Sequence, residues 1–258
     1  MGRNLEYPKR ARNTVKRYDS RGTYDAGAIH KIINATPVLH VSFPPGSEDP
    51  FPALLPMIGV MGSFEYPSAD INEPLDCYLH GYVSARLMRL ARDSEKGIPV
   101  TIAATQVNGL VLSLTPNSHS MNYESAVLQG YGKPVEDTEE KVFAMELITN
   151  KVFPDRWANT RIPPDGAEMS STMILKVSIE TGSGKIRQGE PHDEAKDTKR
   201  DDITDKVWTG VVPVYQTFGE PIPSALNKVK ELPQYIGSHL TQAASKNKQR
   251  AAEAAKEP

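Results

Sequence analysis

A strand-like run gives way to a helix-like one within Leu79-His80-Gly81-Tyr82-Val83-Ser84-Ala85-Arg86. Gly81 relaxes the backbone at this junction, and Ser84 stands where it would cap a helix that we predict from Ser84 to Glu95. Exposed N–H groups at a helix start attract anions, so the Ser84 hydroxyl and the Arg86 guanidinium would together grip a phosphate. The same residues also suit a plain capped helix with a solvated arginine, and the pattern alone leaves both interpretations open.

The segments before this junction predict one short helix followed by strands. Asp25 precedes a predicted helix from Ala26 to Ala35, which carries isoleucines at helical spacing on one face. Strands are predicted from Val38 to Phe43, from Ala53 to Met61 and from Leu75 to Leu79.

The segments after the junction are again mostly strand-like. Strands predicted from Val100 to Val107 and from Leu110 to Thr115 are joined at Asn108-Gly109, a pair typical of a hairpin turn. Gly130 and Gly132 mark a bulge or a close backbone approach within a further strand. The remaining predicted elements are strands from Tyr123 to Val135, Ser171 to Glu180 and Val207 to Tyr215, a helix from Asp137 to about Val152, and a mobile charged loop from Gly189 to Asp205. This order predicts a mainly β fold with peripheral helices, either a barrel or a sandwich.

Composition divides the chain into three parts. Residues 1–20 form a basic N-terminal arm without the apolar run that a signal peptide needs. Residues 21–218 hold the periodic segments expected of one folded domain. Residues 219–258 form a polar, Ala/Lys-rich tail that we expect to be helical or disordered.

Charge and cysteine content exclude several classes of partner. The net charge of −2 gives no reason to expect nucleic acid or an anionic membrane as a partner, and no apolar run suits a membrane span. The single cysteine, Cys77, excludes an internal disulfide and a cysteine-based metal cluster, and it fits the cytoplasm. The spacing of the histidines does not suggest a metal site.

Together with its flanking segments, the junction resembles the phosphate-binding turn of the pyridoxamine 5′-phosphate oxidase superfamily, the FMN-binding split barrels. It is most similar to the flavin-nucleotide-binding branch that includes the nitroimidazole-resistance proteins, where His-Gly is followed by Ser-x-Arg at a helix start. The resemblance spans residues 20 to 215. Its other matching segments are Arg21 to Asp25, Leu55-Pro56-Met57, Ser120 to Ser125, Glu139-Glu140-Lys141, Arg156-Trp157, Ser183 to Gly189 and Trp208 to Pro213.

This resemblance implies a Greek-key split β-barrel that binds FMN at the interface of a homodimer. The implied flavin contacts are His80, Gly81, Ser84 and Arg86 at the phosphate, the backbone of Pro56, Met57 and Ile58 at the ring edge, Ser125 on a neighbouring strand, and Lys185, Arg187 and Trp208 from the second subunit. One departure is Glu124, which stands where the family strand has arginine. Either that arginine makes a structural ion pair in the family, or FMN binds more weakly here.

The sequence leaves three functions open and identifies no catalytic side chain. An FMN-dependent oxidoreductase would take electrons from NADH, NADPH or a small-molecule substrate, and the flavin itself would carry the chemistry. The alternatives are a non-catalytic carrier of flavin or haem, and a partner-binding dimer with a vestigial site. We expect no pyridoxamine phosphate oxidation, because the chain lacks the arginine-rich C-terminal end with which those oxidases hold their substrate.

Overall fold

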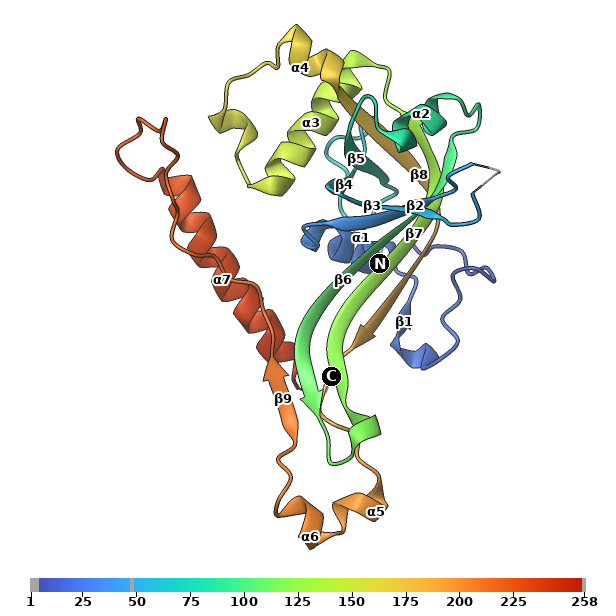
Figure 1. Ribbon diagram of the computed structural model, residues 1–258, viewed down its shortest axis with the longest axis vertical. Helices are drawn as coiled ribbons and strands as arrows, with labels where there is room; N and C mark the ends of the chain where they lie inside the picture. Colours follow the sequence, from blue (N-terminus) through green and yellow to red (C-terminus); the bar gives the residue numbers. More distant parts are fainter. Residues whose placement is uncertain (1–4, 47–48, 257–258) are drawn as a thin grey trace. The chain divides into compact units, whose positions relative to one another are not determined.

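The computed structural model describes residues 5–46 and 49–256, and most of its regular structure belongs to a nine-stranded, mainly antiparallel sheet (Figure 1). The strand order is β3-β2-β6-β7-β8-β5-β4, with β1 paired to β8 and β9 paired to β6. The strands are β1 (Gly22–Thr23), β2 (Leu39–Phe43), β3 (Ala53–Met57), β4 (Gly59–Gly62), β5 (Asp76–Tyr82), β6 (Ile98–Leu112), β7 (Ser120–Pro134), β8 (Thr172–Arg187) and β9 (Gly210–Pro213). This architecture confirms the mainly β class.

The helices lie beside the sheet or follow it along the chain (Figure 1). They are α1 (Ala26–Ala35), α2 (Arg86–Arg92), α3 (Thr138–Val152), α4 (Gly166–Ser171), α5 (Ala195–Thr198), α6 (Asp201–Thr204) and α7 (Gln234–Ala254). The described contacts divide the chain into two compact units. The first holds residues 1–106 and 125–185, and the second holds residues 107–124 and 186–258.

The core of the first unit lies between the sheet and two capped helices. The Asp25 carboxylate accepts the N–H of Ala28 at 2.7 Å at the start of α1, whose isoleucines are buried. Asp137 caps α3 in the same way, through the N–H of Glu140 at 2.7 Å. One face of α3 packs on a buried cluster that includes Val60, Tyr78 and Ile174 from β4, β5 and β8. The helix starts predicted at Asp25 and Asp137 are therefore confirmed.

In the second unit, hydrogen bonds to a backbone carbonyl hold the end of α7 against the ends of strands. The Ala254 carbonyl accepts the Asn122 side-chain amide at 2.9 Å and the Gly189 N–H at 2.9 Å. Ala251 and Ala254 are buried, whereas the other residues of α7 are half-buried or exposed. Within the predicted tail of residues 219–258, Gln234–Ala254 form α7, whereas residues 219–233 hold no helix or strand.

The predicted hairpin at Asn108-Gly109 is wrong. Both residues lie inside β6, where Gly109 pairs with Pro213 and the Asn108 carbonyl accepts the N–H of Val214 at 3.0 Å. A Cβ at Gly109 would lie 2.8 Å from Val211 Cγ1, so the glycine serves the close approach of β9 instead of a turn. By contrast, of the bulge or close approach predicted at Gly130 and Gly132, the structure shows a close approach. A Cβ at Gly130 would lie 2.1 Å from the Ser178 carbonyl oxygen, and one at Gly132 would lie 2.7 Å from Leu175 Cδ2.

Three further element predictions need correction. The strand predicted from Ala53 to Met61 is divided at Ile58, because β3 pairs with β2 while β4 pairs with β5. The loop predicted from Gly189 to Asp205 contains the one-turn helices α5 and α6. The end of β8 also lies beyond the predicted Glu180, at Arg187.

Candidate functional site

The junction between β5 and α2 forms a tight turn. The Ala85 N–H donates to the Tyr82 carbonyl at 2.9 Å, and α2 begins at Arg86 with Ala85 as its cap residue. Ser84 therefore does not cap the helix, because the turn moves the helix start two residues beyond the predicted position. Its hydroxyl is exposed and makes no hydrogen bond to another described residue.

Arg86 is held in place, and none of the described carboxylates neutralises its charge. Its Nη2 donates to the Pro45 carbonyl at 2.5 Å, a contact between segments 41 residues apart. Within residues 5–46 and 49–256, no carboxylate forms an ion pair with it. His80 is also exposed, at the end of β5. The turn thus presents a fixed guanidinium, a free hydroxyl and an imidazole, and these donors suit an anion.

The end of β3 lies next to this turn. The Ile58 carbonyl accepts the N–H of His80 at 3.0 Å, and Gly59 pairs with Leu79 in the sheet. Pro56 is exposed at the β3 edge, and Met57 is nearly buried. The structure therefore brings the residues predicted for the ring edge and for the phosphate onto adjoining segments.

Ser125 and Lys185 contact each other elsewhere in the first unit. The Ser125 hydroxyl donates to the Lys185 carbonyl at 3.1 Å, and the Lys185 ammonium donates to the Arg17 carbonyl at 2.7 Å. No hydrogen bond among the described residues connects this pair with the turn at Arg86.

Arg187 and Trp208 belong to the second unit and differ sharply in exposure. Arg187 is only 3% exposed, and its guanidinium donates to the Asn122 side-chain oxygen, to the Gly189 carbonyl at 3.2 Å and to the Glu190 carbonyl at 3.0 Å. Trp208, in contrast, is 65% exposed. Arg187 thus holds strand ends together within its own unit, and Trp208 is available to a partner. Glu124 is half-buried and, within the described part of the chain, forms no ion pair.

Two cavities open on the first unit, and none of the residues predicted for the flavin lines either one. A cavity of about 470 Å³ is lined by the proline-rich segment after β2, with Thr101, Tyr131 and Arg12. A cavity of about 770 Å³ is lined by Tyr7, Phe64, Asp76 and Lys176, among others. The predicted flavin contacts therefore lie outside both cavities.

A charged network joins β5, β8 and α3 at the larger cavity. The Lys176 ammonium lies 2.8 Å from Glu140 and 3.5 Å from Asp76, and the buried Tyr78 hydroxyl donates to Glu140 at 2.7 Å. Burial raises the pKa of Asp76, because it disfavours the ionised carboxylate. These contacts satisfy the partly buried charges, and the network is structural.

Two histidines are occupied by hydrogen bonds. His30 Nδ1 faces the Ile71 carbonyl at 2.8 Å and therefore carries the proton, so Nε2 accepts from the Tyr7 hydroxyl at 2.6 Å. Burial lowers the pKa of His30 and favours this neutral form. In the second unit, His119 Nδ1 accepts the Ser113 N–H at 3.1 Å. Both therefore have structural roles in this fold.

The sequence interpretation missed two partners of the predicted residues. Pro45 holds Arg86, and Asn122 receives Arg187, although Asn122 lies inside a segment that the motif comparison already included. No local pattern marks Pro45, because a backbone carbonyl can be supplied by any residue type.

No group of three or more His, Cys, Asp or Glu side chains within the described ranges is arranged to hold a metal ion. Of the helices that the structure describes, none is both long and apolar enough to span a membrane.

The mainly β fold and the turn that carries Arg86 define the class to which this chain belongs. Residues 25–186 match the model of the family described as pyridoxamine 5′-phosphate oxidase, so the chain belongs to that family of flavin-binding proteins. The family indicated by the sequence motifs is thereby confirmed. A search of curated proteins gave no match.

Two solved structures are similar over most of the chain. The flavocytochrome Anf3 from Azotobacter vinelandii is 24% identical with a TM-score of 0.73, and the match covers 91% of this chain and 98% of that one. The FAD and heme binding protein from Mycobacterium smegmatis is 21% identical with a TM-score of 0.68, covering 84% of this chain and 96% of that one. At these identities, the likeness shows a shared fold.

Proposed function

We propose that this chain binds FMN, with the flavin phosphate at the turn between β5 and α2, and acts as an FMN-dependent oxidoreductase. The observation that carries the proposal is Arg86, a cation fixed by a carbonyl and left without a carboxylate partner in the described chain. A guanidinium held in this way suits a phosphate, which it can bind through paired hydrogen bonds. Membership of a flavin-binding family supports the same assignment.

The residues around this turn have separate roles in the proposal. Arg86, Ser84 and His80 bind the phosphate, and the backbone of Met57 and Ile58 faces the edge of the ring system. When bound, the flavin supplies the electron transfer, while the protein supplies binding, orientation and electrostatics. NADH or NADPH is the proposed electron donor, and a small organic molecule is the proposed acceptor.

We also propose that the active form is a homodimer with the flavin at its interface. Two observations support it: the predicted flavin residues lie outside both cavities, and the chain exposes large apolar side chains. Trp208 is 65% exposed, Ile222 92% and Leu226 90%. Apolar exposure of this kind is typical of surfaces that a partner covers.

Haem is the second candidate ligand. It is favoured by the two similar structures, since one is a flavocytochrome and the other is named for FAD and heme binding. The absorption spectrum of the purified protein separates the candidates, because flavin and haem absorb at different wavelengths. A flavin spectrum that NADH or NADPH bleaches without oxygen would support the oxidoreductase.

Replacing Arg86 tests the phosphate assignment. Arg86→Ala should weaken FMN binding by about 10- to 100-fold, because a charge-assisted hydrogen bond contributes about 1.5–3 kcal/mol. Titration of the apoprotein with FMN, followed by quenching of flavin fluorescence, measures the affinity.

Arg92→Ala is the matched control, because Arg92 is an exposed arginine on the same helix. It should bind FMN as the wild type does. Equal losses in the two variants, or no loss in either, would place the phosphate elsewhere.

A further inference from the structure

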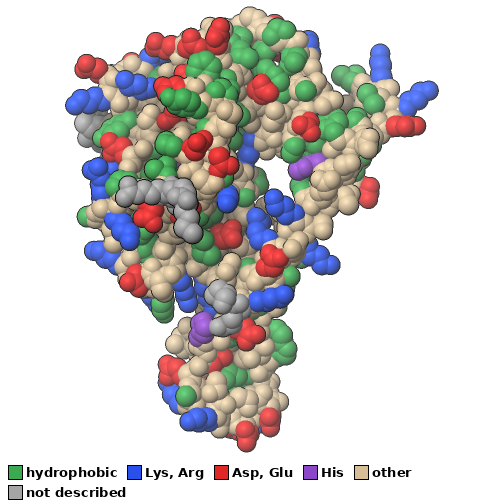
Figure 2. Space-filling model, turned by 180° about the vertical axis from the view of Figure 1, so that it is seen from behind, with side chains coloured by type: hydrophobic (Ala, Val, Ile, Leu, Met, Phe, Trp, Pro, Cys, Tyr) green, Lys and Arg blue, Asp and Glu red, His purple; other side chains and the backbone are tan. Residues whose placement is uncertain are grey.

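Three cations gather around one exposed tyrosine where the N-terminal segment meets the sheet. Arg21 lies 4.5 Å from the centre of the Tyr18 ring, Arg17 lies 5.2 Å from it and the Lys185 ammonium 5.9 Å. We call these four residues the Tyr18 cluster. Figure 2 shows Lys and Arg side chains gathering at the left edge of the view, on the side of the N-terminal segment.

The positive charges of the Tyr18 cluster are not neutralised within the described chain. Arg17, Arg21 and Lys185 take part in none of the ion pairs described there. Asp19 is close in sequence, but its carboxylate accepts the N–H of Ser20 at 2.9 Å. Like charges held close together repel, and the ring faces offset this repulsion only in part. An anion is the group that would complete the cluster.

The backbone holds the cluster in place. Tyr18 has φ 52° and ψ 59°, a left-handed conformation that a tyrosine rarely adopts, and its side chain is 54% exposed. The Lys185 ammonium donates to the Arg17 carbonyl at 2.7 Å, and Gly22 pairs with Lys185 in the sheet. An exposed aromatic residue kept in a strained conformation is typical of binding sites.

Two features indicate which anion would fit. Three cations suit a group with several negative charges spread over neighbouring oxygens, and two guanidinium forks can each bind a phosphate through paired hydrogen bonds. The cluster also adjoins Ser125, whose hydroxyl donates to the Lys185 carbonyl, and Ser125 is a residue that the family resemblance places beside the flavin. A diphosphate that belongs to a larger redox cofactor meets both conditions.

We propose that the Tyr18 cluster binds the diphosphate group of a dinucleotide. The source of this group is a pyridine dinucleotide that brings electrons. FAD does not suit the cluster, because one of its two phosphates is the flavin phosphate that the proposed function places at Arg86. The choice of a pyridine dinucleotide rests on the proposed function, whereas the anion site itself does not.

Titration with inorganic pyrophosphate tests the anion site directly. We would measure binding calorimetrically on the full chain at low salt, in an Arg86→Ala background so that the turn at α2 contributes little. Arg17→Glu should weaken pyrophosphate binding by more than about tenfold, because it replaces an attractive charge with a repulsive one. Arg21→Gln, which keeps a polar side chain at a half-buried position, should weaken binding by a smaller factor.

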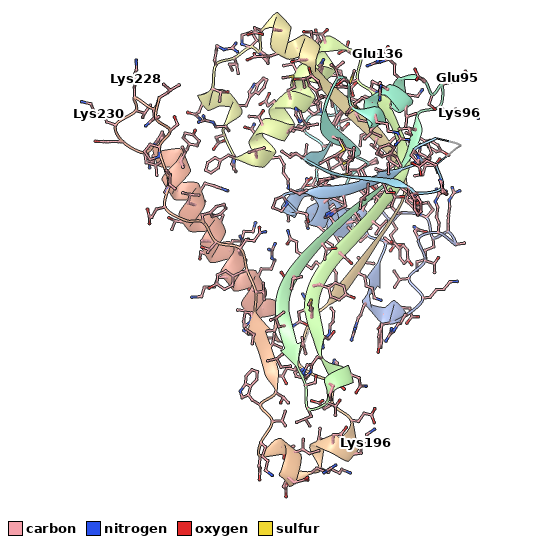
Figure 3. The ribbon with its side chains drawn as sticks, in the orientation of Figure 1. Glu95, Lys96, Glu136, Lys196, Lys228 and Lys230 are labelled. Carbon is pink, nitrogen blue, oxygen red and sulfur yellow. The ribbon has the colours of Figure 1, made fainter. Side chains whose placement is uncertain are left out.

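Lys96→Glu is the control for the change in net charge. Lys96 is exposed on the loop between α2 and β6, away from the N-terminal segment (Figure 3). It should leave pyrophosphate binding unchanged. No pyrophosphate binding in the Arg86→Ala protein, or an equal loss in Arg17→Glu and Lys96→Glu, would overturn the proposal.

Separate titrations with ADP-ribose and FMN then test the dinucleotide. Arg17→Glu should weaken ADP-ribose binding and leave FMN binding unchanged. Loss of pyrophosphate binding alone would refute the dinucleotide. Failure of the wild type to bind any flavin would refute the proposed function but not the anion site.

Discussion

Lys151 carries a positive charge into a half-buried position at the end of α3. Its ammonium donates to the Asn34 carbonyl in the last turn of α1, which gives the charge one good acceptor. Burial nevertheless lowers its pKa from 10.5 to about 8, because the protonated form loses solvation. The nearby thiol of Cys77 is fully buried, and burial raises its pKa to about 12. Both residues are therefore sources of pH-dependent stability.

The lowered pKa of Lys151 predicts a stability that rises with pH. Below about pH 8 the lysine is protonated in the folded and the unfolded chain, so its burial penalty is constant. Between about pH 8 and 10.5 the unfolded chain binds more protons, and the free energy of unfolding should rise. Allowing for its partial exposure, we expect a gain of about 1 kcal/mol.

Urea unfolding of the wild type and of Lys151→Met at several pH values in this range measures the effect. Groups that do not interact with Lys151 titrate alike in both proteins and cancel in the difference. The stability of the wild type relative to the variant should increase with pH by the stated amount. Lys133→Met, at an exposed position on β7, is the control and should show no such trend. A difference between the wild type and Lys151→Met that does not change with pH would contradict the prediction.

At the scale of elements, α7 depends on one buried side chain. Asn122 is fully buried, and its amide donates to the carbonyls of Gly189 at 3.0 Å and Ala254 at 2.9 Å. Its oxygen also receives the Arg187 guanidinium. A single residue of β7 therefore satisfies the last helical carbonyl, a loop carbonyl and a buried charge.

Asn122→Ala should lower the free energy of unfolding by about 2–4 kcal/mol, because it removes two buried hydrogen bonds to carbonyls and one acceptor of a buried guanidinium. Chemical denaturation followed by circular dichroism measures the loss, and hydrogen exchange should show faster opening of α7 than in the wild type. Asn247→Ala, on the exposed surface of α7, removes only the bond to the Gln216 carbonyl and should cost less than about 0.5 kcal/mol. Similar losses in the two variants would contradict a special role for Asn122.

Some elements could be predicted from the sequence and others could not. The difference is how far apart along the chain the interacting residues lie. Helices α1 and α3 were predictable because an aspartate cap acts within four residues of the helix start. The extended conformation at Asn108-Gly109 was not predictable, because it depends on pairing with β9, about a hundred residues later in the chain. The same limit applies to the candidate site. The position of Arg86 followed from its motif, whereas its contact with Pro45 depends on the folded chain.

At the scale of the whole molecule, the predicted single domain of residues 21–218 and the two compact units divide the chain at different positions. The irregular segment between β9 and α7 exposes several large apolar side chains, among them Phe218, Ile222 and Leu226, and the last two are 92% and 90% exposed. Burying side chains of this size contributes about 1.5–3 kcal/mol each. A second copy of the chain is the partner that we propose for this segment.

Replacing both Ile222 and Leu226 with aspartate should therefore shift the protein toward monomers. Sedimentation velocity at micromolar concentration measures the change, and we expect at least tenfold weaker association, because charged residues would have to be buried at the interface. A double variant with aspartate at Lys228 and Lys230 is the control, because these lysines lie in the same segment (Figure 3). A dimer that persists in the Ile222/Leu226 variant would show that the contact lies elsewhere.

The hydrogen bond between Arg86 and the Pro45 carbonyl also affects the entropy of phosphate binding. A free arginine side chain has rotamer entropy worth about 2 kcal/mol, which is lost when a ligand fixes it. Here the proline-rich segment before β3 restrains the side chain as the protein folds, before any ligand arrives. Part of the ordering required for recognition is therefore complete in the unbound protein, and association proceeds with a smaller loss of side-chain freedom.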